Sequence, residues 1–268
     1  MKKTKATTKI MGILNANEDS FFKNSRFQGE DAVFKIKQMI EDGADIIDLG
    51  GVSSRPGSVP VSWEEELKRV KPIIDLIYKQ KLYEKIDFSL DSYQVNVLKY
   101  ALDRGFKIIN DITGLENDEV CKLAGLYKAP VVIMHMQNNP KNMQEKPSYN
   151  DVILDIDNFF KQRIEKAKSF GIDEIILDVG IGFGKTLDHN LKLIKNLEYF
   201  KHFGYEILMA ASRKSMIDMI VPAKTEERLA GTLSIHLESI KNGASIIRCH
   251  DVKEHFQAIK VQEAILNI

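Results

Sequence analysis

Short, almost continuously apolar runs recur along the chain, and a longer segment of mixed apolar and polar residues follows each one. The runs are rich in β-branched residues and too short for helices, which is typical of parallel strands covered on both faces. The predicted strands are Lys9–Leu14, Asp45–Leu49, Ile86–Leu90, Lys107–Ile109, Pro130–Met134, Glu174–Leu177, Glu206–Met209 and Ser245–Ile247. The pattern therefore predicts a buried parallel sheet.

Amphipathic segments of helical length lie between these runs, and several end at a glycine directly before the next strand. Gly43, Gly105, Gly171 and Gly243 stand where a left-handed residue would end the preceding helix. The predicted helices are Asp31–Glu41, Trp63–Lys79, Gln94–Arg104, Val152–Phe170, His189–Tyr199, Glu226–Lys241 and Val252–Leu266.

The alternation of strands and helices decides between two α/β folds. Eight strand–helix units in about 250 residues have the size and rhythm of a (β/α)8, or TIM, barrel. A doubly wound open sheet would instead carry a GxGxxG turn after its first strand, and Met11–Ile13 does not supply one. No Pro-, Gly- or Ser-rich linker divides the chain, so residues 1–268 are expected to form a single barrel domain.

Composition narrows the setting of the protein but not its chemistry. With 44% hydrophobic and 28% charged residues, the chain can bury a full core. Lys+Arg and Asp+Glu both number 38, so net charge gives no attraction to nucleic acid or to a membrane surface. Cys121 and Cys249 form no CxxC pair, and no apolar run reaches the roughly 18–20 residues of a membrane span. We therefore expect a cytoplasmic protein in which any anion site is local.

Polar residues follow almost every predicted strand, at the end of a barrel where active sites lie. Asp91, Asn110 and Asp178 end the third, fourth and sixth strands, so their side chains can converge over the barrel mouth. Acceptors in a buried mouth suit a flat heterocycle with several N–H donors, although they also suit a metal. Each residue taken singly is explained as well by a cap or a turn, so it is the group that predicts a ligand.

A second set of residues could bind an anion. Asn15, Arg55, Arg248 and His250 supply donors and cations without a nearby acidic excess, which suits a phosphate or diphosphate. Surface ion pairs are the alternative for Arg55 and Arg248. Lys214, at the end of the seventh strand, could bridge ligand anions, hydrogen-bond a ring or neutralise a carboxylate such as that of Asp178.

The segment Gly180–Thr186 resembles a phosphate-binding loop, GxxxxGK[ST], but its first position would be Val179, so the motif fails. We expect its glycines to let a ligand ring approach, with Phe183 stacking on that ring. Five histidines have no triad-like or metal-ligand setting and are expected to be structural or solvent-facing: His135, His189, His202, His236 and His255.

Sequence motifs spread over almost the whole chain form a specific series. They are MGILN (Met11–Asn15), GADIIDLGG to SSRPG (Gly43–Gly57), SLDSY (Ser89–Tyr93), IINDITGL (Ile108–Leu115), APVVIMHM (Ala129–Met136), ILDVGIGFGKT (Ile176–Thr186), SRKS (Ser212–Ser215), RLAGT (Arg228–Thr232) and RCHDV (Arg248–Val252). In this order they resemble the dihydropteroate synthase family. The resemblance implies a transferase on a (β/α)8 barrel that joins p-aminobenzoate to a pterin methyl diphosphate with loss of diphosphate.

The resemblance also implies a role for each matching position. Asp91, Asn110, Asp178 and Lys214 would hold the pterin, with Met134 and Phe183 lining its slot; Asn15 would hold Mg²⁺ on the diphosphate; Arg55, Arg248 and His250 would bind the diphosphate; and Ser54, Arg55, Pro56, Lys214 and Ser215 would border the p-aminobenzoate site. In this family the diphosphate departs early and the arylamine captures a pterin-stabilised cation. Arg55, Lys214, Arg248 and His250 are therefore the expected catalytic residues, and a homodimer formed through late helices is the expected assembly.

The chain departs from the family pattern mainly in its loops, where Val52, Ser54, Val179 and Ala210 replace the usual Glu, Thr, Pro and Gly. Apart from Ser54 itself, the side chains expected to contact ligands stay in place. Two other hypotheses stay open. A pterin-binding barrel could transfer a methyl group from methyltetrahydrofolate to a corrinoid, with little use for Arg55, Lys214 or an anion pocket. A non-catalytic pterin-binding homologue is the other.

Overall fold

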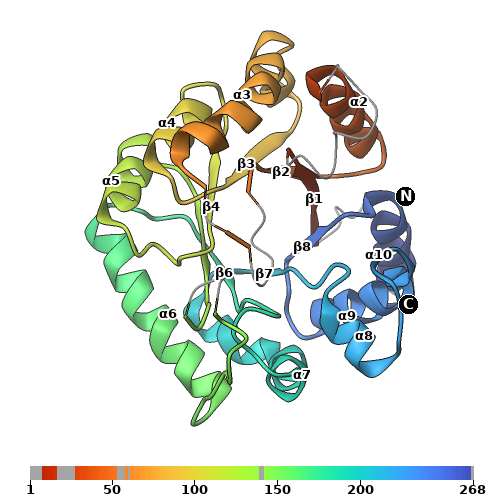
Figure 1. The fold of residues 1–268 in the computed structure, drawn as a ribbon. Helices are drawn as coiled ribbons and strands as arrows, with labels where there is room; N and C mark the ends of the chain where they lie inside the picture. The colour runs from red at the N-terminus through yellow and green to blue at the C-terminus, as the bar shows by residue number, and fades with distance from the viewer. Residues whose placement is uncertain (1–7, 17–27, 53–57, 60, 139–141, 267–268) are drawn as a thin grey trace.

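The computed structural model describes residues 8–16, 28–52, 58–59, 61–138 and 142–266. Within these ranges eight parallel strands form a closed barrel in chain order, with helices around its outside (Figure 1). The strands are β1 (Lys9–Asn15), β2 (Ile46–Gly50), β3 (Asp87–Asp91), β4 (Ile108–Asp111), β5 (Val131–Met134), β6 (Ile175–Asp178), β7 (Glu206–Met209) and β8 (Ile246–Cys249). The predicted (β/α)8 fold is confirmed, and no strand end lies more than two residues from its predicted position.

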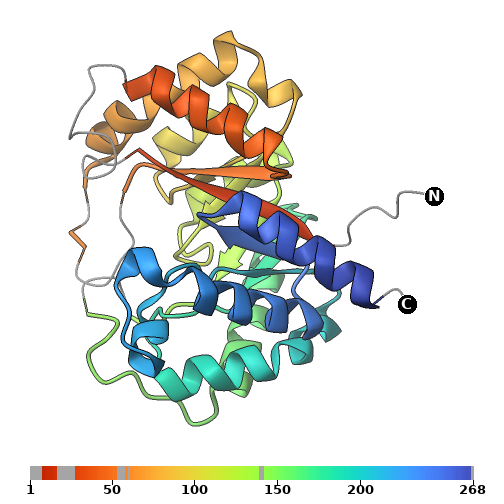
Figure 2. The same cartoon turned by 90° about the vertical axis from the view of Figure 1, so that its right-hand side faces the viewer.

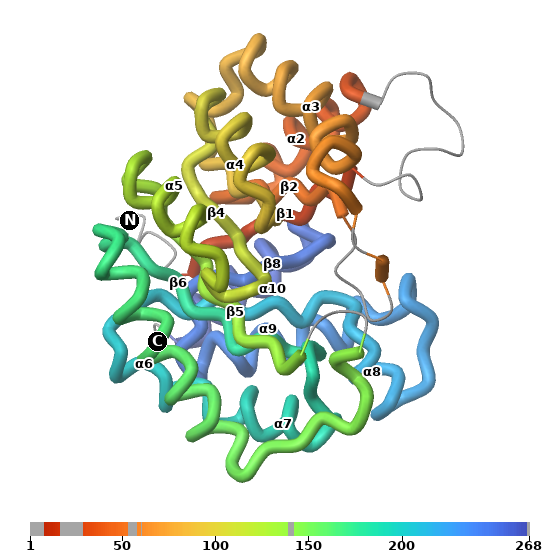
Figure 3. The backbone as a smooth tube through the Cα atoms, turned by 60° about the vertical axis from the view of Figure 1, so that its left-hand side comes forward, coloured from red at the N-terminus to blue at the C-terminus, as the bar shows by residue number. Residues whose placement is uncertain are grey.

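The helices cover the outer face of the barrel (Figure 2). They are α2 (Gln28–Glu41), α3 (Trp63–Lys79), α4 (Val95–Leu102), α5 (Asp118–Tyr127), α6 (Val152–Ser169), α7 (Leu187–Lys195), α8 (Ser215–Ile220), α9 (Leu229–Lys241) and α10 (Val252–Leu266), with short 3-10 helices at Leu82–Glu84, Leu197–Phe203 and Thr225–Glu227. Neighbours in the chain pack side by side, for example α2 with α3 and α6 with α7 (Figure 3). No helix among the described residues is long and apolar enough to cross a membrane.

Two helices were not predicted and one predicted helix is wrong in its second half. Helix α5 follows Asn117, whose side chain accepts a hydrogen bond of 2.9 Å from the Glu119 N–H, so the signal that would have found it is an N-cap. Helix α8 has six residues, too few to show a periodic pattern. The predicted helix His189–Tyr199 is divided, because α7 ends at Lys195 and a 3-10 helix follows.

The interior of the barrel changes from apolar to polar along the strands. An apolar layer fills the barrel from Met11, Ile46, Ile108, Val132, Ile176, Leu208 and Ile246. Side chains on a strand face the same side at every second residue, so the next inward positions lie two residues further on. On β2, β4, β6 and β8 these positions hold Asp48, Asn110, Asp178 and Arg248. Period-two alternation thus places a polar layer directly above the apolar one.

Candidate active site

The carboxyl ends of the first four strands form one row around the barrel mouth. Backbone pairing joins Asn15 to Gly50, Gly50 to Asp91, and Asp91 to Asn110. A Cβ atom on Gly50 would lie 3.6 Å from Asn15 Oδ1 and 3.7 Å from Asp91 Cβ. Asn15 and Asp91 therefore lie on either side of a glycine that keeps the space between them open. The structure brings together Asp91 and Asn110, which the sequence placed in one group, and adds Asn15, which the sequence placed with the anion-binding residues.

Beneath this row, Asp48 joins Asn110 to Arg248. Asp48 is fully buried, and its Oδ2 accepts a hydrogen bond of 3.0 Å from Asn110 Nδ2. The Arg248 guanidinium lies 2.6 Å from the same oxygen and donates to Asp91 Oδ2 at 2.9 Å. Arg248 thus bridges two carboxylates, and the expectation of no acidic excess near it is wrong. Closure of the barrel brings β8 close to β2 and β3, which no local sequence pattern reveals.

The charges of this network are shifted by burial. Burial raises the pKa of Asp91 to about 7, although Arg248 opposes the shift. Burial works to lower the pKa of Arg248, but Asp48 and Asp91 outweigh it and raise that pKa. Arg248 therefore stays charged, while the Asp91 carboxylate takes up a proton as the pH falls through about 7.

Asp178 and Lys214 face the same mouth from β6 and from the loop after β7. The Gly180 N–H donates a hydrogen bond of 2.7 Å to Asp178 Oδ1. Burial lowers the pKa of Lys214 to about 8, against the Asp178 carboxylate, which raises it. The Lys214 ammonium also lies 4.1 Å from the centroid of the Phe183 ring, within the range of a cation–π contact. Lys214 therefore both covers that ring and offsets part of the charge of Asp178.

An apolar wall adjoins these acceptors. It is a separate buried cluster of Ile112, Met134, Met143 and Phe183, with Tyr93 and Met136 packed against it. Met134 pairs directly with Asp178 across β5 and β6. The structure thus brings together Met134 and Phe183, which the sequence analysis named. It adds Ile112, Tyr93 and Met143, which were missed because isolated apolar residues in loops carry no signal of their own.

The loops after β7 and β8 are tied to each other. Ser212 Oγ lies 2.9 Å from His250 Nδ1, and Arg213 forms an ion pair with Asp251. Arg213 has a φ of 57°, and its backbone N–H donates to Thr232 Oγ1 on α9 at 2.9 Å. These contacts fix the backbone next to Lys214 and Ser215. The predicted residues of the two loops are therefore linked to one another.

Three predicted residues, Ser54, Arg55 and Pro56, lie outside the described residues. Within the described ranges, no group of three or more His, Cys, Asp and Glu side chains could hold a metal ion. The five histidines expected to be structural or solvent-facing include His135, His236 and His255, which are buried and hydrogen-bonded to neighbouring elements.

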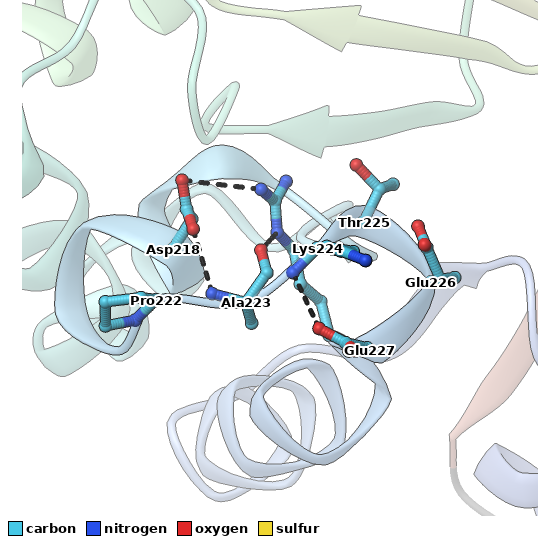
Figure 4. A pocket seen from close by; sticks show the side chains of 8 residues that line it. Asp218, Pro222, Ala223, Lys224, Thr225, Glu226 and Glu227 are labelled. Atoms are coloured by element: carbon cyan, nitrogen blue, oxygen red, sulfur yellow. Dashed lines mark hydrogen bonds and ion pairs between the residues drawn. The ribbon is translucent and has the colours of Figure 1, made fainter.

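A separate hollow of about 640 Å³ lies beside the connection from α8 to α9 (Figure 4). It is lined by Asp218 and residues 222–228. Its polar groups bond one another: Asp218 Oδ1 accepts from the Ala223 N–H at 2.9 Å, and Arg228 Nε donates to Ala223 O at 3.0 Å. None of the described site residues lines it, so the hollow is distinct from the barrel mouth.

Comparisons with known proteins agree with this geometry. The sequence profile of a family described as pterin binding enzyme matches residues 11–250. The dihydropteroate synthase of Escherichia coli strain K12 is 41% identical over 261 residues, which cover 96% of this chain and 92% of that protein. The Yersinia pestis dihydropteroate synthase in a sulfonamide drug complex has a TM-score of 0.91 at 36% identity, covering 97% of this chain and 95% of that one. A Clostridium difficile dihydropteroate synthase, determined in the presence of pteroic acid, has a TM-score of 0.89 at 40% identity and covers 96% of both chains.

Proposed function

Because the chain belongs to the dihydropteroate synthase family of pterin-binding enzymes, we infer that its barrel mouth carries the transfer reaction of that family. The reaction transfers the pterin methyl group of 6-hydroxymethyl-7,8-dihydropterin diphosphate to the amine of p-aminobenzoate and releases diphosphate, a step of folate biosynthesis. One observation carries the assignment of the site. Three acceptor groups, the buried Asn110 and Asp178 and the partly exposed Asp91, lie beside an apolar wall that contains Met134 and Phe183.

This arrangement suits the pterin ring. An aminopterin presents a 2-amino group and ring N–H groups, and carboxylate and amide oxygens accept from them. Asp48 engages the Nδ2 of Asn110, so Oδ1 is the amide atom left for a ligand. Asp178 supplies the charged acceptor, and the flat ring lies against Phe183 and Met134. Lys214 would hydrogen-bond the ring from the side of β7.

The reaction requires stabilisation of the charges on the leaving diphosphate and on the pterin. The C–O bond between the pterin methyl carbon and the diphosphate breaks, and the electron pair leaves with the diphosphate. The amine nitrogen of p-aminobenzoate then forms the new C–N bond and loses a proton. Arg55, Arg248 and His250 would stabilise the leaving diphosphate, and the carboxylates of the mouth would stabilise the cationic pterin. Such a mechanism uses no protein nucleophile.

The proposed Mg²⁺ fits Asn15 only together with the diphosphate. Mg²⁺ prefers oxygen ligands and commonly takes one or two from the protein, with phosphates and waters completing its shell. The Asn15 Oδ1 atom lies at the mouth beside Gly50 and Asp91. Asn15 would therefore hold the ion at the edge of the mouth, where the ion would offset the charge of the diphosphate.

A homodimer is proposed from the surface of α9. The fully buried residues of this helix are polar (Thr232, His236 and Ser239), whereas Leu229 and Leu233 are only half-buried. Apolar side chains left on the outer face of such a helix suit a partner surface. Sedimentation velocity should give a dimer for the wild type and a monomer for Leu233→Glu; a monomeric wild type would contradict the proposal.

A cytoplasmic location is proposed as well, since Cys121 and Cys249 are both buried and free.

A product assay tests the function directly. Purified protein with Mg²⁺ and both substrates should release dihydropteroate and diphosphate in equal amounts. Pterin binding without product would favour the non-catalytic homologue, and methyl transfer to a corrinoid would favour the methyltransferase. The curated relatives favour neither of these alternatives.

Sulfonamides should compete with p-aminobenzoate, because their aniline and sulfonyl groups imitate its amine and carboxylate. The expected contacts are Lys214 and Ser215, together with Ser54–Pro56 in the part of the chain that the structure leaves undescribed. Initial rates at varied p-aminobenzoate and drug concentrations should show a competitive pattern. A purely non-competitive pattern would place the drug at another site.

A further inference from the structure

The lysine of the Gly-rich segment, Lys185, lies beneath the loop and not in the mouth. Its side chain is buried, and its ammonium lies near four acceptors. Gly180 O and Phe183 O are both 2.9 Å away, His135 Nδ1 is 3.0 Å away and His135 O is 3.3 Å away. An ammonium offers three protons and no acceptor, so these four acceptors favour the charged amine. Burial lowers the pKa of Lys185 to about 7, and the Asp178 carboxylate opposes this shift in favour of the charged form. Lys185 therefore occupies the kind of place that a bound ammonium ion would take.

The loop from Gly180 to Gly184 is wound around this ammonium. Gly180, Gly182 and Gly184 have φ values of 68°, 82° and 62°, in the left-handed region that glycine adopts readily. A Cβ atom on Gly180 would lie 1.9 Å from His135 O, and one on Gly184 would lie 2.6 Å from Gln137 O. The glycines thus allow close packing against the segment after β5, with carbonyls turned to Lys185. The likeness to a phosphate-binding loop therefore reflects the packing of this loop around Lys185.

Two groups of the proposed pterin site, Asp178 and Phe183, are held by the same loop. Gly180, whose carbonyl contacts Lys185, donates its N–H to Asp178 Oδ1 at 2.7 Å. Phe183, whose carbonyl also contacts Lys185, presents its ring to the Lys214 ammonium. The Lys185 ammonium therefore sets the positions of the Asp178 carboxylate and the Phe183 ring, because it binds the carbonyls of Gly180 and Phe183.

Other contacts fasten the outer side of the loop. The Gly182 N–H donates to Asn190 Oδ1 at 2.8 Å, and the Tyr149 hydroxyl donates to Gly184 O at 2.7 Å. Neither of these partners reaches the carbonyls of Gly180 and Phe183. Lys185 is the side chain that ties those two carbonyls to His135 at the end of β5.

We propose that Lys185 is a positioning residue for the transfer reaction, a built-in cation that holds the Gly180–Gly184 loop so that Asp178 and Phe183 meet the pterin. It touches neither substrate and acts through the loop. The proposal rests on the proposed function for the identity of the ligand.

Lys185→Met tests the charge because it keeps the length of the side chain and removes the ammonium. Lys195→Met makes the same change at an exposed position of α7 and serves as the control. Calorimetry with a bare pterin should show a loss of affinity of about 10- to 100-fold in Lys185→Met, from the loss of hydrogen bonds to a charged group. The KM of p-aminobenzoate at saturating pterin diphosphate should stay near the wild-type value. A folded Lys185→Met with wild-type pterin affinity would overturn the proposal.

Chemical rescue separates positioning from general stability. In Lys185→Ala, ethylammonium should restore much of the pterin affinity, whereas tetraethylammonium, which has no N–H donor, should not. A fall in melting temperature without a fall in pterin affinity, or a lost affinity that ethylammonium does not restore, would overturn the role of a built-in cation. Wild-type protein that binds the pterin but makes no product would instead contradict the proposed function.

His135→Ala decides the question if both lysine variants fail to fold. It removes one side-chain acceptor of the ammonium and leaves the lysine in place. Pterin affinity should then fall in the same direction as expected for Lys185→Met, by a smaller factor. Unchanged pterin affinity in His135→Ala would overturn the proposal.

Discussion

Asn110 donates a hydrogen bond from Nδ2 to Oδ2 of Asp48 across the floor of the barrel mouth, at 3.0 Å. An ionised carboxylate can only accept, so Asp48 selects one orientation of the Asn110 amide. Oδ1 of Asp48 is buried and has no hydrogen-bond partner among the described residues. This carboxylate therefore controls the donor and acceptor pattern of the mouth without itself lying in the row that lines it.

Replacing Asp48 by Asn should weaken pterin binding and its selectivity. The change removes a counter-charge of Arg248 and lets the Asn110 amide turn its NH₂ group toward the ligand. We expect a loss of about 10- to 100-fold in pterin affinity, the usual effect of a disturbed buried contact with a charged group. Calorimetry should compare the pterin with its 2-oxo analogue, which replaces the amino donor by an acceptor. An unchanged ratio of the two affinities would show that Asp48 does not set this pattern.

Asp178→Asn should reduce pterin affinity by roughly 2–4 kcal/mol, or about 30- to 1000-fold. The Gly180 N–H holds one side-chain oxygen of residue 178, so the new NH₂ group would turn toward the donors of the ligand. Calorimetry with wild type, Asp178→Asn and Lys214→Met separates recognition from charge neutralisation. Wild-type affinity in a folded Asp178→Asn would mean that Asp178 only neutralises Lys214.

Arg248→Ala should impair more than diphosphate binding. A role confined to the diphosphate would leave binding of a bare pterin intact, but the guanidinium contacts both Asp48 and Asp91. Its removal leaves buried carboxylates unpaired, at a cost of about 3–5 kcal/mol in the free energy of unfolding. His250→Ala should lower turnover and leave bare-pterin affinity near the wild-type value. Urea unfolding and calorimetry check both variants, and an undiminished stability in Arg248→Ala would contradict the network.

The kcat/KM for the pterin diphosphate should fall as the pH rises through about 8, where Lys214 of the free protein loses its charge. Burial lowers the pKa of this lysine to about 8, so the ammonium is present below that pH and absent above it. An arginine stays charged at all accessible pH values, so Lys214→Arg should move this alkaline limb upward if activity remains. Profiles of kcat/KM for the pterin diphosphate test the prediction. A limb at the same pH in both proteins would assign it to another group.

Stability should decrease as the pH falls below about 6.5, through His236 and His255. The Ala211 N–H donates to His236 Nε2 at 3.1 Å, and His236 Nδ1 lies 2.8 Å from His255 Nε2. Each imidazole accepts a hydrogen bond at Nε2 in this chain, so both imidazoles are neutral. Burial lowers the pKa of each. The unfolded chain therefore binds more protons just below the ordinary histidine pKa, so stability is lost on acidification. Unfolding free energies at pH 5 and 7.5 should differ less in His236→Asn/His255→Asn, and an equal difference would refute this source.

The strands of the barrel could be predicted because their signal is local. A run such as Val131–Met134 is apolar throughout, and a buried parallel strand needs that property along its own length. Helix α8 gives no such signal, since six residues are too few for a periodic pattern. The segment Gly180–Thr186 resembles a phosphate-binding loop, but its residue pattern could not predict that its carbonyls face Lys185.

By itself the sequence determined the closed barrel and the residue types at its mouth, because hydrophobic period, turn residues and strand-end polar groups are properties of short segments. Which groups pair depends on how the barrel closes. Arg248 meets Asp48 across 200 residues of chain, and Lys185 meets His135 across 50. Burial, hydrogen bonding and pKa depend on distance in space. Closure of the barrel sets that distance, and no local pattern carries it.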